Sequence, residues 1–376
     1  MAEAPAIPAP EFVLRLRDRL AASPAFRRWA GAFWPTRFLA RRRARQLFDL
    51  AAGFVYAQVL RACVELDLFR VLAAGPLPLP ELARRLGLSE EAAGRLAEAA
   101  TAVGLLQRRR GGYGLGPLGG PMVGNGAVAA MVRHHALFYA DLADPVALIT
   151  GPPGQGALAR FWGYADPARR AGLTPEEAAA YSDLMAASQP LVAEEVLAAY
   201  DFSRHRVLLD VGGGLAAFLI AAARRHPGLA LWLFDLPAVT ALAEARLAAA
   251  GLSARARVFS GDFHADPLPQ GADVITLIRV VHDHDDEAAQ ALLLRVRQAL
   301  KPGGALLICE PMAGTPGAEA MGAAYFNLYL HAMGSGRARR PEELAAMLRR
   351  AGFGRVRLLP TATPVQTRVL HAVAGS

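Results

Sequence analysis

Cysteine is nearly absent from this chain of 376 residues, which has only Cys63 and Cys309. The two cysteines lie far apart and outside any spacing typical of metal ligands. This excludes a disulfide framework and a cysteine zinc site. We therefore expect a cytoplasmic protein in a reducing compartment, with no metal.

Long apolar runs are also missing. The longest, such as residues 215–223, fall well below the roughly 20 residues that a membrane-spanning helix needs. The N-terminus lacks the pattern of a signal peptide. Hydrophobic residues make up 53% of the chain and charged residues 20%, which is typical of a globular protein. The length predicts two domains.

Acidic residues are scarce in residues 1–45, a basic and aromatic N-terminal extension. Its arginines are Arg15, Arg17, Arg19, Arg27, Arg28, Arg37, Arg41, Arg42, Arg43 and Arg45, and its acids are Glu3, Glu11 and Asp18. Apolar residues alternate with them: Phe12, Leu16, Leu20, Phe26, Trp29, Phe33, Trp34 and Phe38. Such a segment can lie at an anionic membrane surface. The alternative is a solvated helical extension that packs on the rest of the protein.

Residues 46–127 have the pattern of a winged helix. Apolar positions at helical spacing predict a buried helix over residues 47–72. After a proline-punctuated turn, a helix over residues 81–86 ends at Gly87, and Ser89 caps the next helix, which runs to about Val103. Residues 108–113 then predict a hairpin.

The charge of the second short helix argues against DNA binding. It carries Glu90, Glu91 and Glu98 against Arg95 alone, whereas a helix that reads DNA needs basic or amide side chains. We therefore expect no nucleic-acid partner and interpret the winged helix as the dimerisation surface of a homodimer. A winged-helix regulator is the less favoured alternative.

The rest of the chain changes its pattern near residue 200. Residues 128–200 predict a helical linker that contributes to a substrate pocket, with breaks near residues 151–153 and 166–167. From residue 201 onward strands alternate with helices, and the expected strands are 206–211, 230–235, 256–260, 272–280, 305–310, 355–360 and 368–373. This predicts an α/β fold, a Rossmann-like, doubly wound and mainly parallel sheet of seven strands.

A glycine-rich turn follows the first of these strands. Gly212 and Gly214 let the backbone approach a ligand at a helix N-terminus. The spacing also satisfies the dinucleotide fingerprint, with Asp235 placed to hold ribose hydroxyls, so NAD is one candidate. Asp210 favours another, because a carboxylate there repels a pyrophosphate but suits an ammonium and a sulfonium.

A third feature supports the same ligand. Asp262 and Phe263 follow the third strand, where a carboxylate can take the adenine amine and an aromatic ring its face. Together the three features predict S-adenosylmethionine as the methyl donor, with S-adenosylhomocysteine as the product.

The motifs together resemble the class I small-molecule O-methyltransferases. They are LLDVGGG (208–214), FDLP (234–237), GDF (261–263), VVHDHDDE (280–287), LKPGG (300–304) and ICEP (308–311). Within that family the chain is most similar to the hydroxyneurosporene or demethylspheroidene O-methyltransferases of purple bacteria. The marks of that group are DLAAGFVYAQVLRACVELDLF (49–69), FWGYA (161–165) and MGSGRARRPEEL (333–344).

The resemblance implies roles for particular residues. His282 matches the family's general base, which accepts the acceptor's proton as the methyl group arrives. Glu310 matches a carboxylate that orients this imidazole, and Asp283 lies beside it. Leu236 and Arg279 match positions near the cofactor.

The chain also departs from the family pattern. Ala338 replaces a second orienting glutamate, His284 a tryptophan, Ala216 the last glycine of the cofactor loop, and Asn327 a common aspartate. The loss of the glutamate leaves Glu310 as the only expected partner. It also leaves open a minority interpretation, in which the protein binds the cofactor but assists decarboxylation or hydroxylation.

Apolar side chains suggest a long, lipophilic acceptor. The expected substrate-binding residues are Phe138, Phe161, Trp162, Met185, Phe326, Asn327, Leu330 and Met333, with Met321 and Tyr329 nearby. The resemblance implies methylation of the tertiary hydroxyl of an acyclic 1-hydroxycarotenoid in spheroidene or spirilloxanthin synthesis. An aromatic polyketide or phenol is the alternative acceptor.

Overall fold

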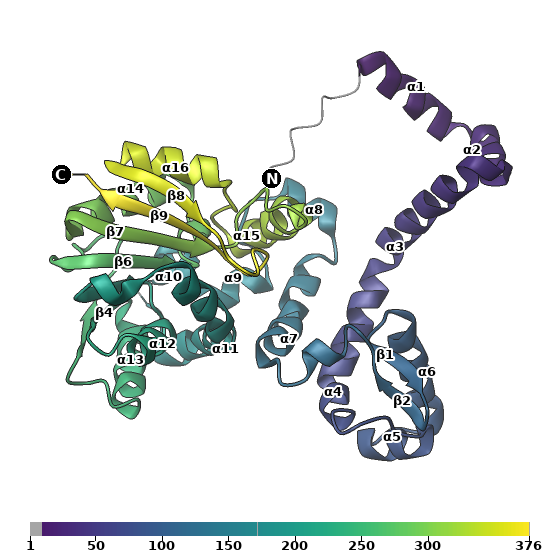
Figure 1. The fold of residues 1–376 in the computed structure, drawn as a ribbon, viewed down its shortest axis with the longest axis horizontal. Coiled ribbons are helices and arrows are strands. Elements are labelled where there is room, and N and C mark those ends of the chain that lie inside the picture. The colour runs from purple at the N-terminus through teal and green to yellow at the C-terminus, as the bar shows by residue number, and fades with distance from the viewer. Residues whose placement is uncertain (1–9, 171, 376) are drawn as a thin grey trace. The chain divides into compact units, whose positions relative to one another are not determined.

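The computed structural model describes residues 10–170 and 172–375, and the chain forms two compact units, Met1–Val123 and Gly124–Ser376 (Figure 1). Residues 1–9 of the predicted N-terminal extension lie outside the described residues. The first unit contains α1 (Glu11–Ala22), α2 (Pro24–Ala32), α3 (Trp34–Glu65), α4 (Leu68–Val71), α5 (Leu79–Leu86), α6 (Glu90–Ala102), β1 (Leu106–Arg109), β2 (Gly112–Leu115) and η1 (Gly120–Met122).

Residues 66–115 form the predicted helix, turn, helix and hairpin. The helix α5 ends at Gly87, whose φ of 66° a glycine adopts without strain. The Ser89 side chain accepts a hydrogen bond from the Ala92 N–H at 3.2 Å and so caps α6. The strands β1 and β2 pair antiparallel, with Leu106 opposite Leu115. Local capping and turn chemistry therefore specify this half of the unit.

The helix α3 differs from the prediction of a buried helix over residues 47–72. It begins earlier, with Pro35 in its first turn, and stops at Leu66, after which Asp67 adopts a φ of 54°. Its residues Leu47, Phe48, Leu50 and Phe54 are exposed in the single chain. The prediction of burial is therefore wrong there, because helical periodicity marks an apolar face without saying what covers it.

The same helix bears on the expectation that no segment spans a membrane. Among the described residues, α3 alone is long and apolar enough to cross a bilayer by length and composition. That test is weak, because a helix that packs against another protein surface passes it too. Five arginines between residues 37 and 45 also interrupt the N-terminal half of α3.

The second unit begins with helices and continues as an α/β domain. The helical part has α7 (Gly126–Asp141), α8 (Pro145–Thr150), α9 (Ala157–Phe161), η2 (Gly163–Ala165), α10 (Pro167–Arg170), α11 (Pro175–Ala199) and η3 (Phe202–Arg204). The α/β part has β3 (Val207–Val211), α12 (Ala217–Arg225), β4 (Ala230–Asp235), α13 (Pro237–Ala249), β5 (Ala256–Ser260), β6 (Ala272–Ile278), η4 (Val281–Asp283), α14 (Asp286–Ala299), β7 (Leu300–Glu310), η5 (Met321–Phe326), α15 (Asn327–Met333), α16 (Pro341–Arg350), β8 (Phe353–Leu359) and β9 (Arg368–Ala374).

The seven strands of the second unit form one sheet in the order β5-β4-β3-β6-β7-β9-β8. Neighbours from β5 to β7 are parallel, while β9 runs antiparallel to both β7 and β8. The predicted strands agree closely with those observed, except that β6 ends at Ile278 and β7 begins five residues early, at Leu300. The doubly wound, mainly parallel sheet is confirmed.

The central strands β3 and β6 are buried on both faces of the sheet, as their uninterrupted apolar runs require. Side chains alternate along each strand, so Leu209 and Val211 of β3 enter one core and Leu208 enters the other. The first core is completed by α14 and α16, and the second by α12, α13 and the C-terminal half of α11 (Figure 1). Packing on both faces fixes where each strand ends.

The predicted four-part division of the chain stays a prediction. The observed units separate after Val123, close to the predicted limit at residue 127. The helix α3 runs without interruption through residues 45 and 46, where the predicted extension ends and the winged helix begins.

Candidate functional site

The sheet changes direction between β3 and β6, and the site lies at this point. The chain proceeds from β3 outward to β5, then returns to place β6 on the other side of β3. The loops after these two strands therefore diverge to opposite faces and leave a crevice at their carboxyl ends. Residues 212–216 follow β3, and residues 279–285 follow β6.

Glycines let the loop after β3 pack closely. Gly212 has a φ of +69°, and a Cβ on it would lie 2.8 Å from the Val280 Cγ2. Gly214 has a φ of +55°, and its N–H donates a hydrogen bond of 2.7 Å to the Asp235 Oδ2. Ala216, where the family has glycine, takes a left-handed φ of 58° just before α12. The loop therefore presents bare backbone at a helix N-terminus.

A cavity of ≈ 130 Å³ opens at this loop. Seven of the eight predicted cofactor residues line it: Gly212, Gly214, Asp235, Leu236, Asp262, Phe263 and Arg279. The structure therefore brings together side chains from the ends of four strands. Their roles with the cofactor stay predictions.

Asp210 is the exception, since its carboxylate does not line the cavity. It lies in the core of β3, where the Thr276 hydroxyl donates a hydrogen bond of 2.6 Å to its Oδ1. Its Oδ2 is buried without a partner among the described residues. Burial raises the pKa of Asp210 to about 7, against the smaller opposing effect of the Thr276 hydrogen bond. The Asp210 carboxylate is thus held beneath the glycine loop, where burial makes its ionised form unfavourable.

Asp235 is held by backbone. Its two oxygens accept hydrogen bonds of 2.7 Å each from the N–H groups of Gly214 and Leu236. Burial raises its pKa to about 6, although both hydrogen bonds act in the opposite direction. The carboxylate is thus fixed in orientation on the cavity wall.

Asp262 lies on the same wall and is paired. Arg170 of α10 donates to its Oδ2 at 3.1 Å, and the His264 N–H donates to its Oδ1 at 2.8 Å. Burial opposes ionisation, but these hydrogen bonds and the Arg170 charge lower the pKa of Asp262 overall. Phe263 lies beside it, with its ring centroid 5.3 Å from that of His284.

His282 lies in the short η4 turn after β6 and is buried between two carboxylates. Its Nε2 is 3.1 Å from the Asp283 Oδ1, and its Nδ1 is 4.0 Å from the Glu310 Oε2. Glu310 also accepts a hydrogen bond of 3.1 Å from the His282 backbone N–H. Burial acts against the imidazolium, but the Asp283 carboxylate and then Glu310 raise the pKa of His282 above its usual value.

Glu310 and Asp283 differ in their surroundings. Glu310 is fully buried at the end of β7, burial raises its pKa, and its Oε1 has no partner among the described residues. The Asp283 Oδ2 accepts a hydrogen bond of 2.8 Å from the Tyr164 hydroxyl. Burial disfavours the ionised form of Asp283, but His282 lowers its pKa overall. Asp283 is therefore the closer partner of the imidazole, where the sequence favoured Glu310.

A second cavity of ≈ 450 Å³ lies on the other side of His282 and Asp283. It shares Tyr164, Met185, Arg279 and Asp283 with the first cavity, so the two meet at the catalytic candidates. Its wall is mostly apolar and includes Ala127, Val128, Met131, Val132, Leu191, Val192, Met321, Tyr325 and Tyr329. Two ligands could thus approach each other beside an imidazole.

Five of the eight predicted acceptor residues line this second cavity: Trp162, Met185, Phe326, Leu330 and Met333. Three do not. Phe138 packs behind the wall against Tyr329, with ring centroids 5.3 Å apart, and Phe161 packs against His134 at 4.6 Å. Asn327 is exposed. Phe138 of α7 and Phe161 of α9 thus belong to the layer behind the wall, and the roles of all three residues with the acceptor stay predictions.

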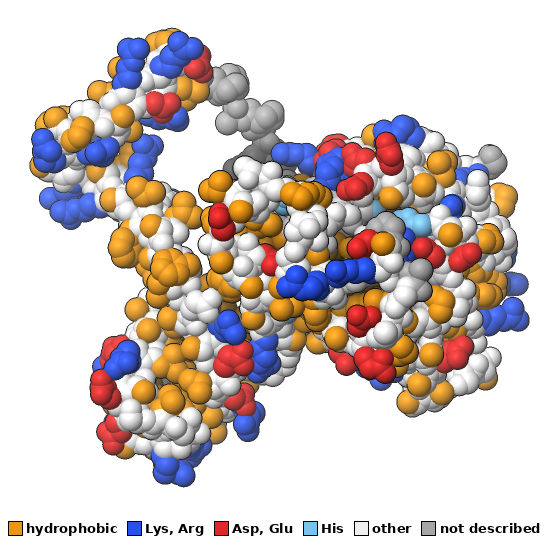
Figure 2. Space-filling model, turned by 180° about the vertical axis from the view of Figure 1, so that it is seen from behind, with side chains coloured by type: hydrophobic (Ala, Val, Ile, Leu, Met, Phe, Trp, Pro, Cys, Tyr) orange, Lys and Arg blue, Asp and Glu red, His pale blue; other side chains and the backbone are white. Residues whose placement is uncertain are grey.

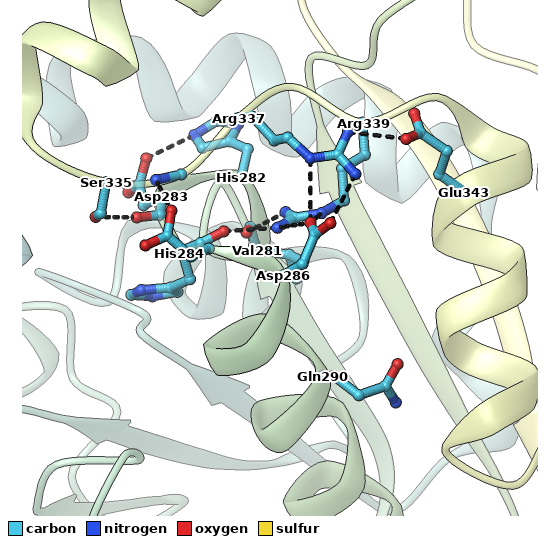
Figure 3. Close-up of polar contacts among 12 residues, drawn as sticks. Val281, His282, Asp283, His284, Asp286, Gln290, Ser335, Arg337, Arg339 and Glu343 are labelled. Carbon is cyan, nitrogen blue, oxygen red and sulfur yellow. Dashed lines mark hydrogen bonds and ion pairs between the residues drawn. The ribbon is translucent and has the colours of Figure 1, made fainter. Parts of the chain in front are cut away.

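The loop that carries His282 is held from behind by residues 335–339 (Figure 3). Arg339 is fully buried and donates to the carbonyls of Val281 and His284 at 2.9 and 2.7 Å and to Asp286 at 2.9 Å. The Ser335 hydroxyl donates to the Asp283 carbonyl at 2.6 Å. A buried arginine on backbone carbonyls fixes a turn that has no regular structure of its own.

Sequence reasoning missed Arg339, Tyr164, Arg170 and Thr276. Arg339 could have been noted, because it follows Ala338 in the segment where the family pattern was compared. Tyr164 stands within the FWGYA motif but carried no assigned role. Nothing in the spacing of Arg170 or Thr276 indicates which carboxylate each contacts.

The site fits a cationic, adenosine-bearing methyl donor. An unpaired buried carboxylate oxygen lies beneath the glycine loop, a second carboxylate is fixed on the wall, and an aspartate–phenylalanine pair lies beyond it. No cluster of three or more histidine, cysteine, aspartate or glutamate side chains that could hold a metal occurs in the part of the chain that the structure describes.

Comparison with known families agrees with this site. The O-methyltransferase domain model matches residues 139–354, and the O-methyltransferase dimerisation domain model matches residues 48–125. The chain belongs to the O-methyltransferase family and has the fold of the S-adenosylmethionine-dependent methyltransferases. This membership excludes a nicotinamide dehydrogenase or a winged-helix DNA regulator as its class.

Particular relatives cover nearly the whole chain. It is 42% identical over 363 residues to the demethylspheroidene O-methyltransferase of Cereibacter sphaeroides, covering 96% of this chain and 95% of that protein. It is 44% identical over 338 residues to that of Rhodobacter capsulatus, covering 89% and 83%. Human N-acetylserotonin methyltransferase in complex with S-adenosylmethionine is structurally similar, with a TM-score of 0.72 at 25% identity, covering 89% and 98%.

We predict that Asp210→Asn stabilises the ligand-free protein at alkaline pH. The pKa of Asp210 is raised from about 4 in the unfolded chain to about 7 in the folded protein, so folding takes up a proton between these values. The stability penalty is therefore full above about pH 7 and disappears as the pH falls toward about 4. Thermal unfolding midpoints should show the largest gain for Asp210→Asn at pH 8 and a shrinking gain toward pH 4. An equal midpoint for both proteins at every pH would contradict a strained carboxylate.

Replacing Arg339 should loosen the loop that carries His282. Arg339→Met leaves two buried carbonyls without donors, so we expect a loss of about 2–5 kcal/mol in the free energy of unfolding. Arg337→Met is the matched control, because the half-exposed Arg337 makes ion pairs with Asp286 and Glu343, worth about 0–1 kcal/mol. Denaturant unfolding measures both, and equal losses would show that Arg339 has no special role.

Proposed function

We propose that this O-methyltransferase methylates the tertiary hydroxyl of an acyclic 1-hydroxycarotenoid of the demethylspheroidene or hydroxyneurosporene type, in spheroidene or spirilloxanthin biosynthesis. The observation that carries the proposal is the identity of 42–44% to two demethylspheroidene O-methyltransferases over most of the chain. S-adenosylmethionine is the proposed donor and S-adenosylhomocysteine the product, with no metal involved.

The second cavity supports a long, lipophilic acceptor. At ≈ 450 Å³ it lies within the range of about 300–1,000 Å³ of small-molecule sites and is more than three times the size of the first cavity, at ≈ 130 Å³. Its wall runs from His282 and Phe326 to Val128 and Met131 of α7. The polar side chains His135 and Tyr325 on this wall bond to each other at 2.8 Å. An extended polyene therefore meets mainly apolar surface.

The donor site is formed by this chain's own groups. When bound, S-adenosylmethionine supplies a methyl carbon on a sulfonium that is open to in-line attack. Asp235 would hold the ribose hydroxyls, Asp262 and Phe263 the adenine, and Asp210 the positive end beneath the glycine loop. Most of the rate then comes from aligning the acceptor oxygen with this methyl carbon.

His282 is the proposed general base, acting through Nε2. Its Nδ1 is fully buried and faces Glu310, so an acceptor cannot reach it. The Nε2 faces Asp283, which lines both cavities. In the tautomer that acts as the base, the imidazole carries its own proton on Nδ1, toward Glu310. The acceptor hydroxyl then approaches the Nε2 lone pair beside the Asp283 carboxylate and gives its proton to it.

The two carboxylates then stabilise the imidazolium that forms. Asp283 lies at the nitrogen that takes the proton and is itself held by Tyr164, while Glu310 lies at the other nitrogen. Asp283 thereby supplies a second carboxylate beside His282, in place of the family's glutamate at the position of Ala338. This arrangement favours methyl transfer over a role confined to decarboxylation or hydroxylation.

The proposed assembly is a homodimer through residues 48–125, which match the dimerisation domain. The exposed apolar residues Phe48, Leu50 and Phe54 of α3 lie in this range and suit contact with a second copy. We propose a cytoplasmic location, in keeping with two free, buried cysteines. The protein would reach its acceptor as a peripheral protein on the inner or intracytoplasmic membrane.

The direct test is His282→Ala. We predict a turnover at least about 10²-fold lower, because the acceptor proton loses its base. Donor affinity should stay within twofold, since His282 does not line the donor cavity. Turnover is measured by mass spectrometry of the methyl ether formed from a detergent-dispersed 1-hydroxycarotenoid, and affinity by calorimetry with S-adenosylhomocysteine.

His331→Ala is the matched control. His331 bonds to the Leu148 carbonyl at 2.9 Å and lines neither cavity, so its loss should leave turnover nearly unchanged. Full activity of His282→Ala would contradict the base. Methylation of a phenol or aromatic polyketide with no methyl ether on the carotenoid would overturn the acceptor and leave the enzyme class intact.

A further inference from the structure

The N-terminal helix α1 carries an apolar face that no described residue of its own unit covers. Phe12, Val13, Leu16 and Leu20 are all exposed, Phe12 by 71%. At 100° per residue these four positions fall within an arc of about 100°, the width of a face that normally packs on a core. The buried cores of this protein include no residue of α1.

The charges of α1 are sorted around this face. By the same spacing, Arg17 and Arg19 border the apolar arc on its two sides, while Glu11 and Asp18 lie on the opposite side of the helix. Arginines beside an apolar face can pair with lipid phosphates while the apolar side chains enter the boundary between headgroups and acyl chains.

The following helices continue the same surface chemistry. The rings of Phe26 and Trp29 on α2 lie 5.5 Å apart and tilted, and Trp29 stacks on Phe33, just after α2, at 5.0 Å. At the start of α3, Trp34 and Phe38 are 74% and 75% exposed. Figure 2 shows hydrophobic and basic side chains mixed along these helices, with few acidic ones. Tryptophan beside arginine is typical of a membrane interface.

This surface lies outside the segment that matches the family's dimerisation domain. The dimerisation domain match begins at residue 48, and every residue of α1, α2 and the first turns of α3 precedes it. A second copy of the same surface is also a poor partner, because residues 10–45 hold ten arginines and two acids and would repel each other. The partner that binds this surface must therefore combine negative charge with an apolar layer.

We propose that α1, α2 and the first turns of α3, residues 11–38, form an interfacial membrane anchor that docks on an anionic lipid bilayer. The helices lie in the surface plane, with Phe12, Leu16 and Phe38 in the acyl boundary and arginines on the lipid phosphates. The anchor deepens the proposed function, because a carotenoid acceptor lies in the bilayer. Its evidence is independent of the acceptor.

The experiment is vesicle flotation of the full chain with S-adenosylhomocysteine present. Phosphatidylcholine vesicles with phosphatidylglycerol should bind the wild type, and vesicles of phosphatidylcholine alone should bind it far less. Phe12→Ser/Leu16→Ser/Phe38→Ser should lose about tenfold or more in binding. Arg19→Gln/Arg28→Gln/Arg37→Gln should lose about 100-fold in binding to anionic vesicles, and high salt should have the same effect on the wild type.

Leu118→Ser/Val146→Ser/Leu294→Ser is the matched control. These three residues are 60%, 68% and 43% exposed outside the anchor and should leave vesicle binding unchanged. Equal flotation of the wild type and the anchor variant would overturn the proposal. The proposal would also be overturned if the anchor variant changed its oligomeric state, measured by light scattering, but bound vesicles as the wild type does. The surface would then contact a second copy of the chain.

Activity on a detergent-dispersed acceptor separates this proposal from the proposed function. The anchor variants should methylate a dispersed 1-hydroxycarotenoid at the wild-type rate and lose activity only when the acceptor is embedded in vesicles. If the wild type bound vesicles but did not methylate the 1-hydroxycarotenoid, the proposed acceptor would be refuted and the anchor supported.

Discussion

The contact on which the site depends is the buried Arg339 guanidinium on the carbonyls of Val281 and His284. The turn between these carbonyls holds His282 and Asp283, and η4 gives it only a single 3₁₀ turn of regular structure. Gly336 packs against the same turn, since a Cβ on it would lie 2.1 Å from the His282 carbonyl oxygen. The catalytic candidates are thus placed by a segment more than 50 residues further along the chain.

This placement puts the imidazole where two cavities meet. Tyr164, Met185, Arg279 and Asp283 belong to both walls, so a donor methyl group and an acceptor oxygen can approach each other there. Arg279 adopts a φ of 57° there and is tied to the Met185 carbonyl and to Gln189 on α11. The strained backbone and the unpaired Asp210 oxygen both lie at the switch point of the sheet, where function rather than stability selects the residues.

The sequence predicts the sheet well because its signals are local. Apolar strands, their glycine-rich ends and the motifs after them fixed the places of Gly212, Asp235, Asp262 and His282 in advance. The residues that line the second cavity were harder to predict. Phe138 and Trp162 are both aromatic residues of helical segments, but only Trp162 reaches the cavity. Contacts such as Tyr164 with Asp283, 119 residues apart, depend on packing that no local pattern records. The burial predicted for α3 failed for the same reason, since periodicity shows a face but not its partner.

The central claim is that the acceptor hydroxyl meets the His282 Nε2 at the junction of the two cavities. A crystal structure with S-adenosylhomocysteine and a 1-hydroxycarotenoid tests it most directly. The account predicts the acceptor oxygen within hydrogen-bond reach of Nε2, about 2.6–3.2 Å, with the polyene in the apolar cavity. An acceptor oxygen placed away from His282, with the polyene outside that cavity, would contradict it.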